Sequence, residues 1–300
     1  AGMTPKEQLK EINAATHELV QQQYSTYNRS LLPQLKQNGL RVIERHEDLT
    51  QEEAAYVDSF YEENVYPVLT PMAVDSSRPF PLIRNKSLNI GALVTKKKDK
   101  KVLEFATVQV PSVLPRIIQI PTVEGENKAV ILLEEVIERN IHKLFLNYDI
   151  VCAHPFRIMR NADFSIEEDE AEDLLKEIEK QLKKRQWGQA IRLEVQDGID
   201  KKLLKIIKQE LSISEEDIYR IDGPLDLTFL MKMYGLEGFE HLKEKKHVPQ
   251  PVPKLPAGED VFAAIREGDI LLHHPYQTFT PVVDFIRQAA NDPEVLAIKQ

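Results

Sequence analysis

The 300-residue sequence lacks the features that mark several classes of protein. Its single cysteine, Cys152, excludes an internal disulfide and a zinc site built from cysteines. No stretch approaches the roughly 18 consecutive apolar residues that a bilayer span needs, so we expect no membrane span. The opening residues, from Ala1 to Pro5, lack the basic and apolar regions of a signal peptide. We therefore expect a cytoplasmic protein.

The sequence also lacks the motifs of the common phosphate and hydrolase sites. It has no Gly-x-x-x-x-Gly-Lys-Ser/Thr loop, no Gly-x-Gly-x-x-Gly and no Gly-x-Ser-x-Gly, and no His-Glu-x-x-His among its eight histidines. His241 and Lys243 begin like the His-x-Lys of phospholipase-D-type sites, but Val248 stands where that pattern needs an acid. A nuclease or lipase of that type stays a remote alternative for this reason.

The chain has fewer basic than acidic side chains. Thirty-nine Lys and Arg against 48 Asp and Glu give a formal net charge of −9. Nonspecific binding of nucleic acid depends on a basic surface that displaces phosphate counterions, so we expect no nucleic-acid partner. A cleft lined by a few cations can still bind a phosphate-rich ligand, because the field that it focuses is local.

The hydrophobic periodicity predicts an α+β fold that opens with helices. Capping boxes at Thr4–Glu7 and Thr50–Glu53 predict the starts of two helices. Between about 65 and 260, strand patterns alternate with helical ones and include an antiparallel hairpin. The predicted helices are 5–27, 31–37, 51–63, 131–145, 165–185, 199–211 and 225–234, and the predicted strands are 40–43, 88–94, 102–110, 116–120, 152–159 and 191–195.

A proline-rich linker separates the last part of the chain from the rest. His247–Gly258 contains four prolines, which favour an extended path between domains. A helix is predicted over 281–290, and Val295–Gln300 has the pattern of a buried parallel strand. Such a strand needs neighbours on both sides. We therefore expect a domain that has been cut short and a chain that is a fragment.

Four residues in this last part are candidates for binding phosphate. His273, His274 and Tyr276 follow the apolar segment 269–272, at a strand end where α/β domains place ligands. The alternative is a packed turn with one histidine bonded to backbone. Lys299 interrupts the closing strand, and a buried lysine needs an anion, which a phosphate or a carboxylate supplies equally well.

Two further cationic groups lie in the middle of the chain. The guanidinium groups of Arg157 and Arg160 can each bind a phosphate through two hydrogen bonds. The alternative is that they form ion pairs with Asp163 or with the acidic run 167–170. Lys96, Lys97, Lys98, Lys100 and Lys101 form the largest basic cluster, which we expect at the solvated tip of the hairpin.

Several stretches together resemble the polyphosphate kinases of the phospholipase-D-like type. The stretches are Asn64–Asp75, Arg78–Pro81, Phe156–Asp163, Ile191–Val195, Asp222–Leu227, Asp269–Phe279 and Ala289–Lys299. The resemblance covers nearly the whole chain and is most specific from Asn64 onward. It implies the end of a helical N-terminal domain over 1–59, a mixed α+β head domain over 60–246, and a linker with the truncated start of an α/β phospholipase-D-like domain over 247–300.

The resemblance implies an activity that this stretch of sequence does not complete. The family moves the terminal phosphate of ATP reversibly onto inorganic polyphosphate through a phosphohistidine, with Mg²⁺, in a homo-oligomer. None of the eight histidines matches the family's phosphoacceptor segment, so no catalytic residue is assigned, and the ligands of ATP and Mg²⁺ are expected outside this stretch. His273, His274, Tyr276 and Lys299 are then expected in the wall of the substrate tunnel, with Arg157 and Arg160 as further substrate-binding candidates. The alternative is a non-catalytic dimerisation module derived from that enzyme.

Overall fold

The computed structural model describes residues 2–74, 80–122, 127–161, 188–256, 258–297 and 299. It divides into two compact units, Ala1–Gly235 and Leu236–Gln300. The helices are α1 (Pro5–Thr26), α2 (Leu32–Gln37), α3 (Gln51–Phe60), α4 (Leu133–Arg139), α6 (Lys201–Leu211), α7 (Phe229–Met233), α8 (Val261–Glu267) and α9 (Thr280–Asn291). The strands are β1 (Leu40–Ile43), β2 (Met72–Val74), β3 (Leu88–Lys96), β4 (Asp99–Gln109), β5 (Ile117–Ile120), β6 (Lys128–Leu132), β7 (Tyr148–Arg160), β8 (Ala190–Gln196) and β9 (Ile218–Ile221).

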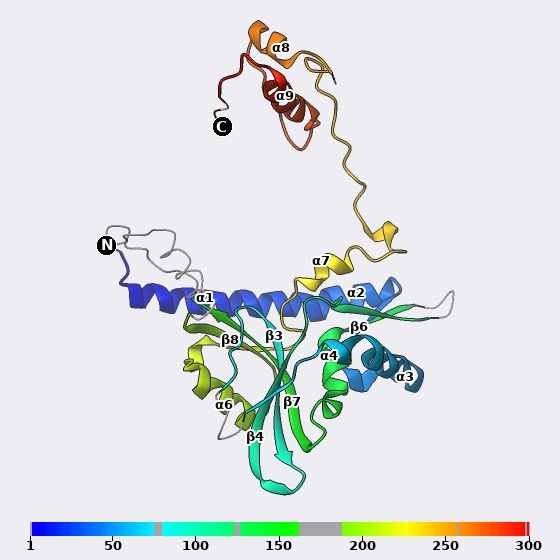
Figure 1. The fold of residues 1–300 in the computed structure, drawn as a ribbon, viewed down its shortest axis with the longest axis vertical. Coiled ribbons are helices and arrows are strands. Elements are labelled where there is room, and N and C mark those ends of the chain that lie inside the picture. The colour runs from blue at the N-terminus through cyan, green and yellow to red at the C-terminus, as the bar shows by residue number, and fades with distance from the viewer. Residues whose placement is uncertain are drawn as a thin grey trace. The chain divides into compact units, whose positions relative to one another are not determined.

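The first unit is built on two sheets, which confirms the α+β prediction. Six strands form a mostly antiparallel sheet in the order β2-β4-β3-β7-β8-β9, and three form a smaller sheet in the order β1-β6-β5. Before them, α1 and α2 follow one another in one long helical segment (Figure 1). Both predicted capping boxes are present, at Thr4 and Glu7 and at Thr50 and Glu53.

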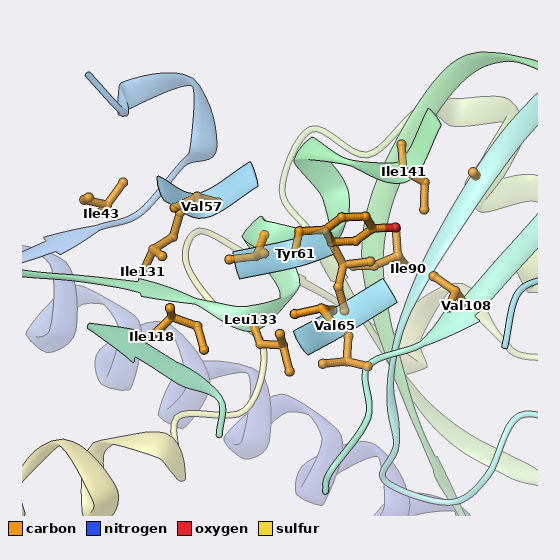
Figure 2. Close-up of a cluster of buried hydrophobic side chains, with 14 of the residues drawn as sticks. Ile43, Val57, Tyr61, Val65, Ile90, Val108, Ile118, Ile131, Leu133 and Ile141 are labelled. Carbon is orange, nitrogen blue, oxygen red and sulfur yellow. The ribbon is translucent and has the colours of Figure 1, made fainter. Parts of the chain in front are cut away.

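One core lies between the two sheets. Val57, Tyr61 and Val65 come from one face of α3 and the helical turns that continue it, because residues four apart lie above one another on a helix. They pack against Ile131 of the small sheet and Ile90 of the large sheet, as Figure 2 shows. This arrangement buries Tyr61 completely.

A second core covers the opposite face of the large sheet. Successive strand residues point to opposite faces, so Ile90 and Val94 of β3 face the first core and Leu93 faces the second. On the second face α6 packs Leu203, Ile207 and Leu211 against Phe156 and its neighbours. Burial on both faces explains why β3 is apolar without alternation.

Some of the predicted elements differ in the structure or lie outside the described residues. The predicted helix 131–145 is wrong at its start, because Ile131 pairs with Ile43 and Ile118 as a strand residue, and α4 begins at Leu133. Backbone pairing with two neighbouring strands outweighs the helical pattern there. The predicted helix 165–185 lies outside the described residues.

The predicted closing strand is also not formed in its described part. Residues 295–297 are not in a strand, and Leu296 is 96% exposed. A strand needs a hydrogen-bonded neighbour, and the described residues of the second unit contain only one isolated bridge, Gln250 with Gln277. The apolar segment at 269–272 is likewise irregular, with Leu271 90% exposed.

The second unit has a small core of its own. Val252, Leu255 and Val261 are buried, and Phe285 of α9 packs on them with Ala264, Ile270 and Leu272. Across the described parts of both units, no helix combines the length and apolarity needed to traverse a bilayer.

Candidate functional site

The loop 273–279 of the second unit brings together three of the predicted site residues. Gln277 closes it: its side-chain Oε1 accepts the His273 backbone N–H at 2.8 Å, and its own N–H donates to the His273 carbonyl oxygen at 2.8 Å. The His273 ring lies 4.9 Å from the ring of Tyr276. The peptide bond between His274 and Pro275 is cis. The closure of the loop by Gln277 places the rings of His273 and Tyr276 side by side.

His247 belongs to the same cluster, although it opens the linker in the sequence. Its Nε2 lies 3.1 Å from the carbonyl oxygen of Pro275, and its ring meets the Tyr276 ring edge-on at 5.7 Å. Three residues on, Gln250 donates its N–H to the Tyr276 carbonyl oxygen at 2.8 Å and accepts the Thr278 N–H at 2.9 Å. The start of the linker is therefore hydrogen-bonded to the loop 273–279. The proline-rich composition of the linker could not predict this contact.

The loop can offer imidazole and phenol groups to a ligand. Tyr276 is 57% exposed, and His274 turns its Nδ1 toward the Gln277 carbonyl oxygen at 3.0 Å, which fixes one side of its ring. No carboxylate occurs in 273–279, so this loop by itself does not fit Mg²⁺, which prefers carboxylate oxygens. Lys299 is exposed in the structure, not buried as its place in an apolar run suggested.

Arg157 lies elsewhere, in a network of buried charges in the first unit. Its Nη1 donates to Glu194 Oε2 at 3.0 Å, and its Nη2 lies 3.6 Å from Asp226 Oδ2. Arg192 reaches the other oxygen of Glu194 at 2.7 Å and stacks its guanidinium 3.9 Å from the centre of the Tyr219 ring. The partners expected from the sequence, Asp163 or the acidic run 167–170, lie outside the described residues. The partners that the structure shows are Glu194 and Asp226.

Arg160 bonds to backbone groups of the neighbouring chain segments. Its Nε donates to the Ile83 carbonyl oxygen at 3.0 Å and its Nη1 to that of Gly188 at 2.9 Å. Arg157 and Arg160 therefore hold protein groups in this structure, and their binding of phosphate stays a prediction.

A pocket of about 590 Å³ opens beside the Arg157 network. Its lining combines the four charged residues Arg157, Arg192, Glu194 and Asp226 with Tyr24 and Tyr27 of the helical segment. Two cations and two anions cancel within it, so it offers no net positive charge to a phosphate.

One group of side chains in the described parts of the chain places histidine and carboxylate ligand atoms within 4.8 Å of one another. It consists of His46, Glu47 and Glu135. Glu135 Oε2 accepts the His46 backbone N–H at 2.9 Å and lies 3.1 Å from its Nδ1, so it also ties the short turn His46–Asp48 to α4. No local sequence pattern singled out any of the three.

Glu138, one helical turn after Glu135, lies in unfavourable surroundings for a carboxylate. Burial, followed by the negative charges of Glu135 and Glu47, raises the pKa of Glu138 to about 9. Its Oε2 is buried and has no hydrogen-bond partner among the described residues. We therefore expect this carboxyl group to be protonated at neutral pH.

Comparison with known families accounts for most of the chain. The polyphosphate kinase middle domain matches residues 52–233, the N-terminal domain of the same family matches 1–43, and its C-terminal domain 1 matches 260–300. The chain belongs to the polyphosphate kinase family. This confirms the resemblance drawn from the sequence.

Individual members of the family are similar over this whole stretch. The polyphosphate kinase of Halalkalibacterium halodurans is 47% identical over 303 residues, which cover all of this chain and 43% of that protein. The polyphosphate kinase of Bacillus anthracis is 47% identical over 306 residues with the same coverage. That of Aphanizomenon baltica is 40% identical over 322 residues, covering 99% of this chain and 82% of that sequence. The chain thus spans about two fifths of the length of the first two relatives.

A solved structure shares the fold. The crystal structure of polyphosphate kinase from Porphyromonas gingivalis superposes with a TM-score of 0.75 at 20% identity, over 96% of this chain and 41% of that one. At that identity the likeness supports the arrangement of helices and sheets described above, and no more.

Proposed function

We propose that this chain is part of an enzyme that transfers the terminal phosphate of ATP reversibly to inorganic polyphosphate through a phosphohistidine. The observation that carries the proposal is the ordered match to three successive domains of one family, from residue 1 to residue 300. Phosphoryl transfer depends on positioning and on cationic stabilisation, and a histidine nucleophile divides it into two easier steps. The division into 1–59, 60–246 and 247–300 stays a prediction within this proposal.

The proposal gives this stretch a supporting part in the reaction. His273, His274, Tyr276 and Lys299 would contribute to the wall along which polyphosphate passes, with Mg²⁺ and ATP held by residues outside the stretch. The exposed Tyr276 ring, supported by His247 and His273, is the best-defined element of that wall. By itself the chain is expected to transfer no phosphate.

A chimera tests the proposal directly. The chain would be joined at Gln300 to the remainder of the H. halodurans relative, to which it is 47% identical. Because the family's nucleophile would then be supplied, we expect ATP-dependent polyphosphate synthesis by the chimera and none by the 300-residue chain. A chimera with a native-like circular dichroism spectrum and a cooperative thermal transition, but without synthesis, would contradict the proposal, as would synthesis by the chain alone.

One observation favours a second candidate, a non-catalytic module that dimerises. On α1 the apolar side chains of Leu9, Ile12 and Leu19 are between 60% and 68% exposed. They share one helix face at spacings of three and seven residues, so a second copy could cover them together. Light scattering after size exclusion separates the candidates: a stable dimer without activity supports the module, and a monomer contradicts it.

A further inference from the structure

The turn between β3 and β4 concentrates positive charge on an acidic chain. Residues 96–101, called the lysine turn below, contain five lysines and one acid, Asp99. The other residues of the chain carry 34 cationic and 47 acidic side chains. The lysine turn is therefore a local positive region on a protein whose overall field is negative.

The backbone projects this turn away from the sheet. Lys96 pairs with Asp99 across the hairpin and with Tyr148, the first residue of β7, on the other side. The turn therefore lies beyond the end of the neighbouring strand, and the β3–β4 hairpin protrudes from the first unit in Figure 1. The Lys97 backbone N–H donates to the Asn147 carbonyl oxygen at 3.2 Å, which anchors its base.

One acid of β4 already pairs with the lysine turn. The Lys96 Nζ lies 2.9 Å from Glu104 Oε1. Asp149 lies opposite Thr95, just before the turn. Lys97 and Lys98 are exposed, and Lys100 and Lys101 follow them in sequence. By sequence, the lysine turn holds four further lysines and one aspartate beyond the Lys96–Glu104 pair, a formal excess of three positive charges.

We propose that the lysine turn is a docking site for chains of inorganic polyphosphate. A run of exposed lysines binds a polyanion by releasing its counterions, whereas a single phosphate gains too little from strongly hydrated ammonium groups. The turn contains no aromatic residue on which a base could stack, so it lacks the second element of a single-stranded nucleic-acid site. A polymer made only of charged phosphate oxygens fits it better. The choice of this polyanion rests on the function proposed above.

Binding of end-labelled long-chain polyphosphate, followed by fluorescence anisotropy without ATP or Mg²⁺, tests the site. The test variant is K97Q/K98Q/K100Q/K101Q, which keeps the Lys96–Glu104 pair. The control variant, K6Q/K10Q/K201Q/K202Q, removes the same charge from exposed positions on α1 and α6. Each variant is first checked for an unchanged circular dichroism spectrum and thermal midpoint.

We expect the test variant to bind at least about tenfold more weakly, and its slope of log K against log salt to fall by about 0.7 for each lysine that contacts phosphate. The control variant should stay within about twofold of the original chain in affinity, because it changes only the overall field.

Equal losses of affinity in both variants, or no binding by the original chain, would overturn the proposal. An oligodeoxynucleotide of equal charge that binds as tightly would overturn the assignment to polyphosphate. The chimera reports on phosphate transfer separately, so a failure here and a failure there can be told apart.

Discussion

Arg157 and Glu194 are direct cross-strand partners, paired in register between β7 and β8. Both are buried, at 9% and 5% exposure, and Glu194 receives Arg157 on one oxygen and Arg192 on the other. A carboxylate this deep is tolerated because two guanidinium groups compensate it. The pair joins β7 to β8, and Arg157 also approaches Asp226.

Removing that carboxylate should be costly. We expect Glu194→Ala to lower the free energy of unfolding by about 3–5 kcal/mol, because two buried cations lose their partner. Glu215→Ala is the matched control: Glu215 also bridges two cations, Lys208 and Arg220, but is 60% exposed, so its loss should cost far less. Urea unfolding followed by circular dichroism measures both. An equal loss of unfolding free energy in the two variants would show that burial of the Glu194 network does not increase its contribution to stability.

The raised pKa of Glu138 predicts how stability depends on pH. Its carboxyl group has a pKa of about 9 in the folded chain against an ordinary 4.5, so between these values the folded state binds one more proton than the unfolded state. Stability should therefore fall as pH rises through this window, by up to about 1.4 kcal/mol per unit. Below about pH 4 both states are protonated and the effect vanishes.

Glu138→Gln should remove this dependence. We expect the variant to be more stable than the original chain at pH 8 and similar at pH 4.5, by urea unfolding at each pH. Glu210→Gln, an exposed position on α6, controls for the loss of one charge. Parallel pH profiles for the original chain and Glu138→Gln would refute the assignment.

Two buried tyrosines differ in what their hydroxyl groups do. In the part of the chain that the structure describes, the buried Tyr61 hydroxyl has no hydrogen-bond partner, whereas the Tyr24 hydroxyl donates to the Pro224 carbonyl oxygen at 2.8 Å. Tyr61→Phe should therefore leave stability unchanged or raise it, while Tyr24→Phe should cost about 1 kcal/mol. Thermal midpoints of the two variants decide the point, and a larger loss in Tyr61→Phe would contradict it.

Local signals predicted much of the fold. Helix starts at Thr4 and Thr50 follow from side chains three residues apart, and the β3–β4 hairpin follows from two apolar runs around a charged turn. The error at Ile131 arises from long-range contacts. Ile131 is a strand residue because it pairs with Ile43 and Ile118, and the hydrophobic periodicity around residue 131 carries no information about these partners.

The candidate site shows the same limit. Two histidines after a predicted strand marked the loop 273–279, but the contact of His247 with Tyr276 depends on how the linker folds back. Glu194 lies 37 residues after Arg157, so no local pattern linked them, and acids nearer in sequence were the natural expectation. Long-range partners of charged side chains were thus the least predictable part.

Phosphate labelling of the chain by ATP tests the central claim most directly. Purified chain would be incubated with Mg²⁺ and γ-labelled ATP, and the protein assayed for acid-labile, base-stable phosphate, with the chimera as positive control. We predict label on the chimera and none on the 300-residue chain, because the function proposed above assigns the phosphoacceptor to none of its eight histidines. Stable phosphohistidine on any of the eight would contradict it.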